Sequence, residues 1–309
     1  MSAATITGSL PARASLGARF VGSRFFAVAV VVIGIVIVWY AGAFLLDAPF
    51  QRYLDSRANV ERTPVEFLRA TFNQPKPTLP TPHQVAVDTF NSTILVNPTK
   101  PSSLLFHAWV TLSSTLAGFI SGTLLGVLIA VGIVHLKSLD KSLMPWIISS
   151  QTIPILAIAP MVIVVLAAVG VTGLIPKALI STYLSFFPVT VGMVKGLRSP
   201  APIHLDLMRT YNSSRWQVFW KLRVPASLPF LFTSMKVAVA AALVGAIVAE
   251  LPTGAVAGIG AKLLVGSYYS QSIQMWSALV VGSLMAALLV TAVGIVERLV
   301  TRRMGARPS

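Results

Sequence analysis

Residues 109–134 form the sequence WVTLSSTLAGFISGTLLGVLIAVGIV, a run of 26 residues without a charged side chain. A helix needs about 20 apolar residues to cross the hydrocarbon core of a bilayer, so this run is long enough to span it. Gly118, Gly122 and Gly126 recur every four residues and fall on one face of such a helix. Because small residues at this spacing let a second helix approach closely, we expect a transmembrane helix packed tightly against a neighbour.

The composition of the whole chain indicates a membrane protein. Of its 309 residues 55% are hydrophobic and only 11% are charged, and the mean hydropathy is +0.79. A soluble domain carries about 25% charged residues, so lipid must replace water around most of this chain. The sequence contains no cysteine, which excludes disulfides, thiolate metal sites and cysteine nucleophiles.

Five further apolar segments complete a set of six expected spans: residues 25–46, 143–169, 174–194, 230–251 and 273–296. The first is longer than the roughly 7–15 residues of a signal-peptide core, so we expect an uncleaved span. The second contains Pro145, Pro154 and Pro160 and is expected to be kinked or broken. The predicted fold class is therefore all-α, a polytopic membrane protein with six transmembrane helices.

Residues 47–105 interrupt this pattern with five of the nine acidic residues and a high density of prolines. We expect a solvated periplasmic segment with two short helices, around residues 60–72 and 81–96, on either side of a proline-rich stretch. The expected organisation is a cytoplasmic tail (1–24), a first span (25–46), this periplasmic segment, a core with five spans (106–300) and a second cytoplasmic tail (301–309).

The distribution of basic residues predicts the orientation in the membrane. Fifteen of the 24 lysines and arginines lie in residues 1–24, 135–142, 195–228 and 297–309. Because short cytoplasmic segments carry an excess of Lys and Arg, we expect both termini in the cytoplasm. The net charge of +15 is also compatible with a nucleic-acid surface, but that surface would need its basic residues clustered on one soluble face. We therefore expect membrane lipid, and no nucleic acid, as the partner of these charges.

The polar stretch at residues 199–229, SPAPIHLDLMRTYNSSRWQVFWKLRVPASLP, is expected to form a helix–turn–helix elbow on the cytoplasmic side. Ser199 followed by Pro200 fits the start of a first helix. Asn212 tolerates the left-handed conformation that often ends a helix. Ser214 followed three residues later by Gln217 predicts a capping box at the start of a second short helix.

One face of this second helix is predicted to be aromatic, with Trp216, Phe219 and Trp220 at positions i, i+3 and i+4. Pro225 and Pro229 are expected to end the helix before the next span. Such a segment either lies on the lipid headgroups or inserts into a groove of a partner protein. The residues alone leave both alternatives open.

The elbow resembles the EAA loop of ABC-importer permeases, in the branch that serves nitrate, sulfonates and taurine. The branch pattern is E-A-A-R-T-x-G-A-S-R-W-Q-x-F, followed by L-P-x-x-L-P. The matching residues are Arg209, Thr210, Ser214, Arg215, Trp216, Gln217, Phe219, Pro225, Leu228 and Pro229. The sequence departs from the pattern at Asp206, at Leu207 with Met208, and at Asn212, where the family has Glu, two Ala and Gly. Asp keeps the carboxylate and Asn keeps the left-handed tolerance, so the elbow is expected to form.

Weaker resemblances extend in order over residues 80–303. They comprise Leu79–Pro82, Ser113–Phe119, Ile153-Pro154, Ala159-Pro160, Phe186–Pro188 and Lys236. The resemblance implies a binding-protein-dependent transport system inner membrane component, with its permease core in residues 106–300. Such a subunit pairs with a second permease copy or a homologous permease, docks cytoplasmic ABC ATPase subunits and receives solute from a periplasmic solute-binding protein. The residues implied to couple to the ATPase are Asp206, Arg209, Asn212, Arg215, Trp216, Phe219, Trp220 and Pro225.

The sequence carries little that predicts chemistry of its own. It has no G-x-x-x-x-G-K-[ST] loop, so ATP hydrolysis is expected on a separate subunit and no cofactor is expected here. His83, His107, His135 and His204 lack metal-ligand spacing, and neither a metal site nor a catalytic residue is predicted. Glu250 stands at the end of an apolar span, where we favour a cap or salt bridge over a proton carrier. An ion-coupled secondary transporter is the alternative function, although it would need several buried carboxylates and internal repeats.

Hydroxyls and an amide near the proline-broken span predict the solute pathway, with Gln151, Thr152, Ser181 and Ser185 as the candidate lining residues. The alternative role for the hydroxyls is to bond the backbone of their own helices. Uncharged polar groups suit a small polar solute. Within the branch this means a nitrate-like or sulfonate-like anion, or a nitrogen heterocycle such as a thiamine-pyrimidine precursor. The predicted location is the bacterial inner membrane.

The topology can be tested with single cysteines, because the chain has none of its own. We expect Ser56→Cys to react with a membrane-impermeant thiol reagent in intact cells, and Ser309→Cys to react only after the cells are opened. Labelling of position 309 but not 56 in intact cells would contradict the orientation and, with it, the cytoplasmic position of the elbow.

Overall fold

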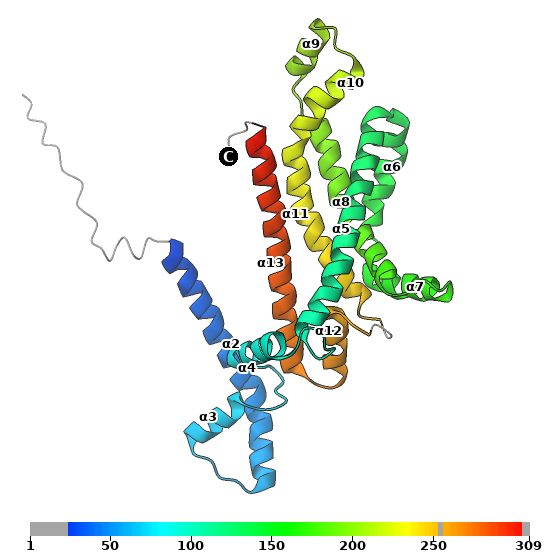
Figure 1. The fold of residues 1–309 in the computed structure, drawn as a ribbon. Helices are drawn as coiled ribbons and strands as arrows, with labels where there is room; N and C mark the ends of the chain where they lie inside the picture. Colours follow the sequence, from blue (N-terminus) through cyan, green and yellow to red (C-terminus); the bar gives the residue numbers. More distant parts are fainter. Residues whose placement is uncertain (1–23, 253–255, 305–309) are drawn as a thin grey trace, which may run out of the picture. The chain divides into compact units, whose positions relative to one another are not determined.

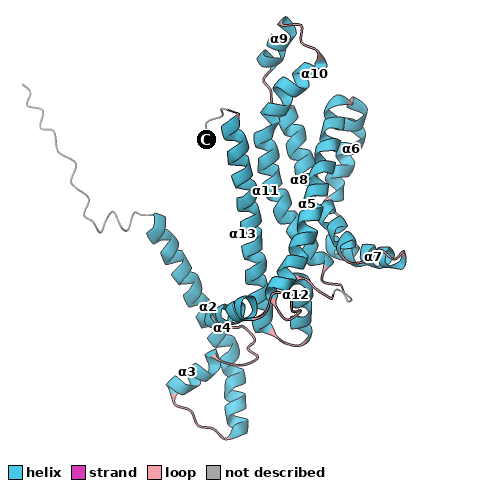
Figure 2. Cartoon of the chain, viewed as in Figure 1, coloured by secondary structure: helices cyan, strands magenta, loops and turns pink. Residues whose placement is uncertain are grey.

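The computed structural model describes residues 24–252 and 256–304, and every regular element in these ranges is a helix (Figure 2). The expected tail at 1–24 lies outside the described residues except for Arg24, and the tail at 301–309 lies outside them from residue 305 onward. The chain divides into two compact units, residues 1–84 and 85–309. This boundary falls inside the expected periplasmic segment 47–105.

The first unit is built on one long helix, α2 (Arg24–Ala58), of 35 residues. At 1.5 Å per residue α2 is roughly 50 Å long, which exceeds the ~30 Å hydrocarbon core of a bilayer. The expected span 25–46 is therefore only its first part. Helix α3 (Pro64–Phe72) follows, and a capping box between Thr63 and Glu66 fixes its start. The Asp47 carboxylate accepts hydrogen bonds from the backbone N–H groups of Thr78 (2.5 Å) and Leu79 (3.4 Å), which fold the proline-rich stretch back onto α2.

Helix α4 (Pro82–Phe90) continues into one π-helical turn, η1 (Asn91–Leu95). These two elements match the second short helix expected around residues 81–96. Ser103 then caps the next helix, because its hydroxyl accepts a hydrogen bond from the backbone N–H of Leu105 at 3.2 Å. The two short helices predicted for residues 47–105 are therefore both present.

The second unit is a helical bundle (Figure 1). Its long helices are α5 (Leu104–His135), α8 (Leu174–Leu197), α11 (Val224–Ala249) and α13 (Ser272–Arg303). Among the described residues five helices, α2 included, are long and apolar enough to cross a membrane. The bent pair α6 (Lys137–Ser150) and α7 (Ile155–Ala168) makes six if it is counted as one span. The predicted all-α polytopic fold is confirmed.

The predicted break in the third span is also confirmed. Helices α6 and α7 meet at an angle of 98°, and Pro154 is the N-cap residue of α7. Pro145 and Pro160 lie inside α6 and α7. Only the central proline therefore separates two helices.

Helices α5, α8 and α11 pack most extensively against one another. The glycines of α5 face α8: a Cβ atom on Gly118 would lie 2.2 Å from the Cβ atom of Ser181, and one on Gly122 would lie 2.0 Å from Ser185 Oγ. On α11, a Cβ atom on Gly245 would lie 2.9 Å from the Ser181 Cα atom. These glycines therefore allow the close approach that their spacing predicts.

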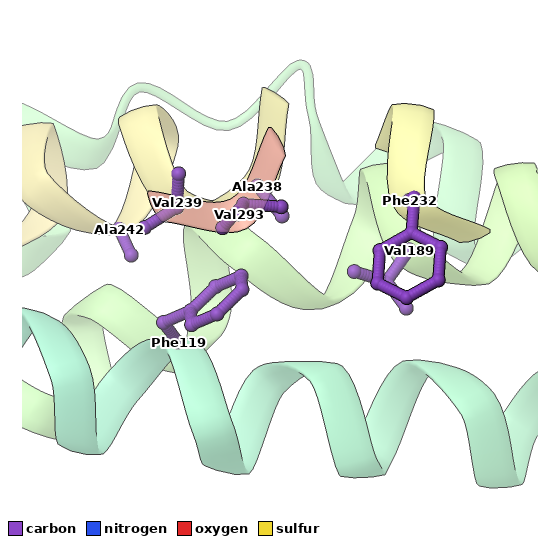
Figure 3. Packing of buried hydrophobic residues seen from close by; sticks show 7 residues of the cluster. All are labelled: Phe119, Val189, Phe232, Ala238, Val239, Ala242 and Val293. Atoms are coloured by element: carbon purple, nitrogen blue, oxygen red, sulfur yellow. The ribbon is translucent and has the colours of Figure 1, made fainter. Parts of the chain in front are cut away.

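Buried apolar side chains of four helices, α5, α8, α11 and α13, also pack together in the bundle (Figure 3). This cluster comprises Phe119, Val189, Phe232, Ala238, Val239, Ala242 and Val293. Helix α13 also carries Glu297, which forms an ion pair with Lys236 of α11. Helices α9 (Pro202–Thr210) and α10 (Arg215–Val218) lie at one end of the bundle, and α12 (Ile259–Tyr268) lies at the opposite end (Figure 1).

The α5–α8 contact predicts a sharp difference between two Gly→Ala substitutions. Gly118→Ala forces a Cβ atom into Ser181 and should destabilise the bundle by about 1–3 kcal/mol, as overpacking does in other cores. Gly294→Ala is the control, because its Cβ atom would meet only Lys236 Cε at an ordinary 3.7 Å. Thermal unfolding of the purified protein in detergent measures both. Equal melting temperatures for the two variants would contradict the close packing.

Candidate functional site

The first candidate site is the elbow, whose first helix begins later than expected. The N-cap residue of α9 is Ala201 and Pro202 is its first residue, so the prediction of a start at Ser199 and Pro200 was wrong. The Ser199 hydroxyl instead donates to the carbonyl of Gly196 at 2.7 Å. Ser199 therefore completes the end of α8 and does not start α9.

The turn between the two elbow helices forms as predicted. Asn212 has φ +51°, in the left-handed region, and its N–H donates to the carbonyl of Arg209 at 2.8 Å. The Ser214 hydroxyl accepts from the Gln217 backbone N–H at 3.3 Å, and Gln217 Oε1 accepts from the Ser214 N–H at 2.9 Å. This capping box and the left-handed residue define a rigid turn.

The second elbow helix does not stop at the prolines, so that prediction was wrong. Helix α10 runs through a π-helical turn, η2 (Phe219–Arg223), into α11, and residues 215–249 form one continuous span. Pro225 lies in the first turn of α11, where a missing N–H is tolerated. A π-helical turn also relaxes the regular hydrogen-bond ladder next to a proline.

The aromatic residues of the elbow separate into two groups. The side chains of Trp216 and Trp220 are 68% and 51% exposed, and their ring centroids lie 5.5 Å apart, edge to face. Phe219 is buried, and its ring centroid lies 5.0 Å from that of His135 at the end of α5. The structure thus leaves two of the three predicted aromatic residues on an exposed face. Phe219 packs into the bundle with Ile133 and Leu197.

The charged residues of the elbow remain exposed. Arg209 Nη1 contacts Asp206 Oδ1 at 3.1 Å, the internal pair that their spacing of three residues predicts, and both side chains are largely exposed. Arg215 opens α10 and is also exposed. Arg215 directly precedes Trp216, and Lys221 directly follows Trp220.

The residues predicted to line the solute pathway differ in their exposure. Gln151 and Thr152 are exposed at the break between α6 and α7. Ser181 and Ser185 are fully buried between helices, and the Ser185 hydroxyl donates to the carbonyl of Gly118 at 3.1 Å. The Ser185 hydroxyl also lies 3.2 Å from the carbonyl of Thr182 in its own helix, and a role of the two serines in the solute pathway stays a prediction.

A second polar site lies at the opposite end of the bundle, around Glu250. This carboxylate is fully buried and accepts hydrogen bonds from the Thr111 hydroxyl (2.8 Å), the Gly260 N–H (3.0 Å) and Lys177 Nζ (3.2 Å). Four elements meet there: α5, α8, the end of α11 and the start of α12. The expectation that Glu250 forms a salt bridge is confirmed.

His107 and Gly258 extend this network. The Gly258 N–H donates to His107 Nδ1 at 2.9 Å, so Nδ1 carries no proton and Nε2 donates to the carbonyl of Pro101 at 2.8 Å. Gly258 has φ +130°, and a Cβ atom there would lie 2.0 Å from the Glu250 carboxyl carbon. Only glycine therefore fits between Glu250 and the start of α12.

A cavity of about 690 Å³ adjoins this network, and we call it the Trp109 cavity. Its walls come from α5, α7, the residues around the start of α8, the end of α11 and the described residues between α11 and α12. The lining residues are Trp109, Val110, Ser113, Ile163, Val164, Ala167, Val171, Thr172, Gly173, Leu174, Pro176, Lys177, Ala249, Pro252, Val256 and Ala257. The sequence did not predict this site. A signal was present, because Lys177 is an isolated charge near the start of an apolar span.

Comparison with known proteins identifies the relatives of this chain. Residues 122–306 match the family model described as binding-protein-dependent transport system inner membrane component. A probable ABC transporter permease protein of Haemophilus influenzae is 31% identical over 57% of this chain and 69% of its own. The riboflavin transport system permease protein RibX of Chloroflexus aurantiacus is 30% identical over 65% and 74%.

A third relative is the formylaminopyrimidine transport permease protein ThiX of Halalkalibacterium halodurans, which is 30% identical over 59% of this chain and 68% of its own. More distant relatives are named for aliphatic sulfonates, bicarbonate and nitrate. The named relatives therefore include transport proteins for both heterocycles and small anions.

The buried ion pair predicts opposite behaviour for single and double substitutions. Lys177→Met or Glu250→Gln alone leaves one group without its partner and should cost about 3–5 kcal/mol, whereas the double variant should recover most of the loss. Asp140→Asn, which breaks the partly exposed pair with Arg198, should cost about 1 kcal/mol or less. Thermal unfolding in detergent measures all four variants. Single variants as stable as the parent would contradict a structural role for the pair.

Proposed function

Because this chain belongs to the family of binding-protein-dependent transport system inner membrane components, we propose that its elbow docks the ATPase subunit of an ABC importer. The chain is a permease subunit, and its helical bundle provides part of the path across the membrane. ATP hydrolysis takes place on the docked subunit, since the sequence carries no nucleotide-binding loop. The single observation that carries the docking proposal is the exposed pair Trp216 and Trp220 on a rigid, capped turn.

Three properties of the elbow favour a protein partner over lipid headgroups. Its aromatic pair is exposed although Phe219 of the same segment is buried, and tryptophan and arginine are the residues that dominate binding energies at protein interfaces. The turn is held by the capping box of Ser214 and by Asn212, so little conformational entropy is lost when a partner binds. The elbow helices also extend past the ends of their neighbours in the bundle (Figure 1).

Phe219 would transmit movement between the docked subunit and the membrane helices. Its ring is buried among residues of α5 and α8 and stacks edge to face on His135. A displacement of the tryptophan face therefore pushes directly on the end of α5. In this proposal the two tryptophans bind the ATPase, and Phe219 couples it to the bundle.

The proposed assembly contains further partners. It pairs this chain with a second permease copy or a homologous permease, and a periplasmic solute-binding protein delivers the solute. The proposed setting is the bacterial inner membrane with both termini in the cytoplasm. The cargo is a small polar solute, either a nitrogen heterocycle or a sulfonate-like or nitrate-like anion. An ion-coupled carrier is disfavoured, because the buried Glu250 already has three hydrogen-bond partners, one of which, Lys177, is its counter-ion.

Removal of the tryptophan pair tests the docking. We expect Trp216→Ala with Trp220→Ala to abolish co-purification of the ATPase subunit from detergent, because each such anchor contributes about 2 kcal/mol or more at an interface. Trp146→Ala is the matched control, since Trp146 is 76% exposed on α6. The double variant should keep the melting temperature of the parent, because neither ring is buried. Normal ATPase capture and solute uptake by the double variant would contradict docking and favour an elbow that lies on the membrane surface.

A further inference from the structure

The Trp109 cavity is large, and its lining is mostly apolar. Among the described lining residues Lys177 is the one charged side chain, and Ser113 and Thr172 add hydroxyls. A volume of about 690 Å³ falls in the range that small-molecule sites occupy in proteins. Pockets of this kind combine an apolar surface with a few polar groups that orient the ligand.

Lys177 is held rigidly in the cavity wall. Its Nζ donates to Glu250 Oε1 at 3.2 Å and to the carbonyl of Ala257 at 2.8 Å. A lysine ammonium has three N–H donors, so one is left for an acceptor on an occupant. Because Glu250 already balances its charge, Lys177 suits a neutral acceptor better than a full anion. The same contact to Ala257 fixes one wall of the cavity.

Trp109 supplies the flat surface of the site. Its side chain is 67% exposed although it lines the cavity, so much of the indole is not covered by other described residues. Aromatic faces pair well with other flat rings at offset stacking distances. An apolar ring system that carries one acceptor would therefore satisfy both Trp109 and Lys177.

We propose that the Trp109 cavity is a solute-binding site for a flat aromatic heterocycle, which stacks on Trp109 and accepts a hydrogen bond from Lys177. This rests on the proposed importer function and narrows its cargo from the two classes to one. A nitrate-like anion would leave most of the cavity empty and would meet a lysine whose charge is already neutralised. A lipid chain would offer no acceptor to the third N–H donor of Lys177. The site lies at the end of the bundle that the proposed topology turns toward the periplasm, where solute arrives.

A single cysteine in the cavity wall tests the occupant. The chain lacks cysteine, so Ser113→Cys provides the only reactive thiol of the permease in a complex with its ATPase, reconstituted in lipid nanodiscs. The measured quantity is the rate of modification by a small methanethiosulfonate reagent. We expect riboflavin or an aminopyrimidine at saturating concentration to slow this rate severalfold, and nitrate and taurine to leave it unchanged.

Trp109→Leu in the same background should abolish the protection, whereas Trp146→Leu, a substitution of another exposed tryptophan, should preserve it. Three results would overturn the proposal. The first is that neither heterocycle protects the thiol of Ser113→Cys, and the second is that nitrate protects it equally well. The third is that, without solute, the thiol reacts in detergent but not in nanodiscs. The last result would identify lipid as the occupant. ATPase capture by the complex is measured in parallel, so a failure of this site is distinguished from a failure of the importer function.

Discussion

The close contact between α5 and α8 is the constraint on which the rest of the bundle depends. Within a bilayer, apolar side chains gain little by leaving lipid for protein, so helices associate through close packing and buried polar contacts. Gly118 and Gly122 bring the backbone of α5 against Ser181 and Ser185, and Gly245 brings α11 to the same place. Three helices therefore meet closely at one place in the bundle.

This geometry explains how a carboxylate can be buried beside a membrane span. Thr111, Lys177 and Glu250 come from three different helices, and each reaches the others because those helices already pack closely. Removing two charges from water is costly, and the cost is offset only where geometry and additional hydrogen bonds are good. The N–H of Gly260 and the hydroxyl of Thr111 provide those bonds. The ion pair in turn holds the start of α12 and one wall of the Trp109 cavity.

Local features of the structure were predictable from the sequence, and long-range ones were not. The spans follow from apolar runs, the 98° break from Pro154, and the elbow turn from Asn212 and the Ser214 capping box, all of which act within a few residues. The burial of Phe219 was missed because a regular helical period places it beside Trp216, whereas the π-helical turn and the contact with His135 depend on a helix 84 positions earlier. A salt bridge of Glu250 was expected, but its partner Lys177 was not identified for the same reason, since the two residues lie 73 positions apart.

The two proposed roles, ATPase docking and solute binding, fall at opposite ends of the bundle. At the elbow, exposed rings and basic side chains stand on a turn whose own hydrogen bonds are complete, so a partner can bind without unfolding anything. Phe219 connects that surface to the buried core through contacts with α5 and α8, beside the continuous helix that runs into α11. The same α5 carries Trp109 and Thr111 at its other end. A rigid helix that is pushed at His135 must move at Trp109 as well, unless it bends. The stripe of glycines between these points keeps α5 in close contact with α8. The contact of Phe219 with His135 and the Trp109 wall of the cavity therefore lie at opposite ends of one closely packed helix.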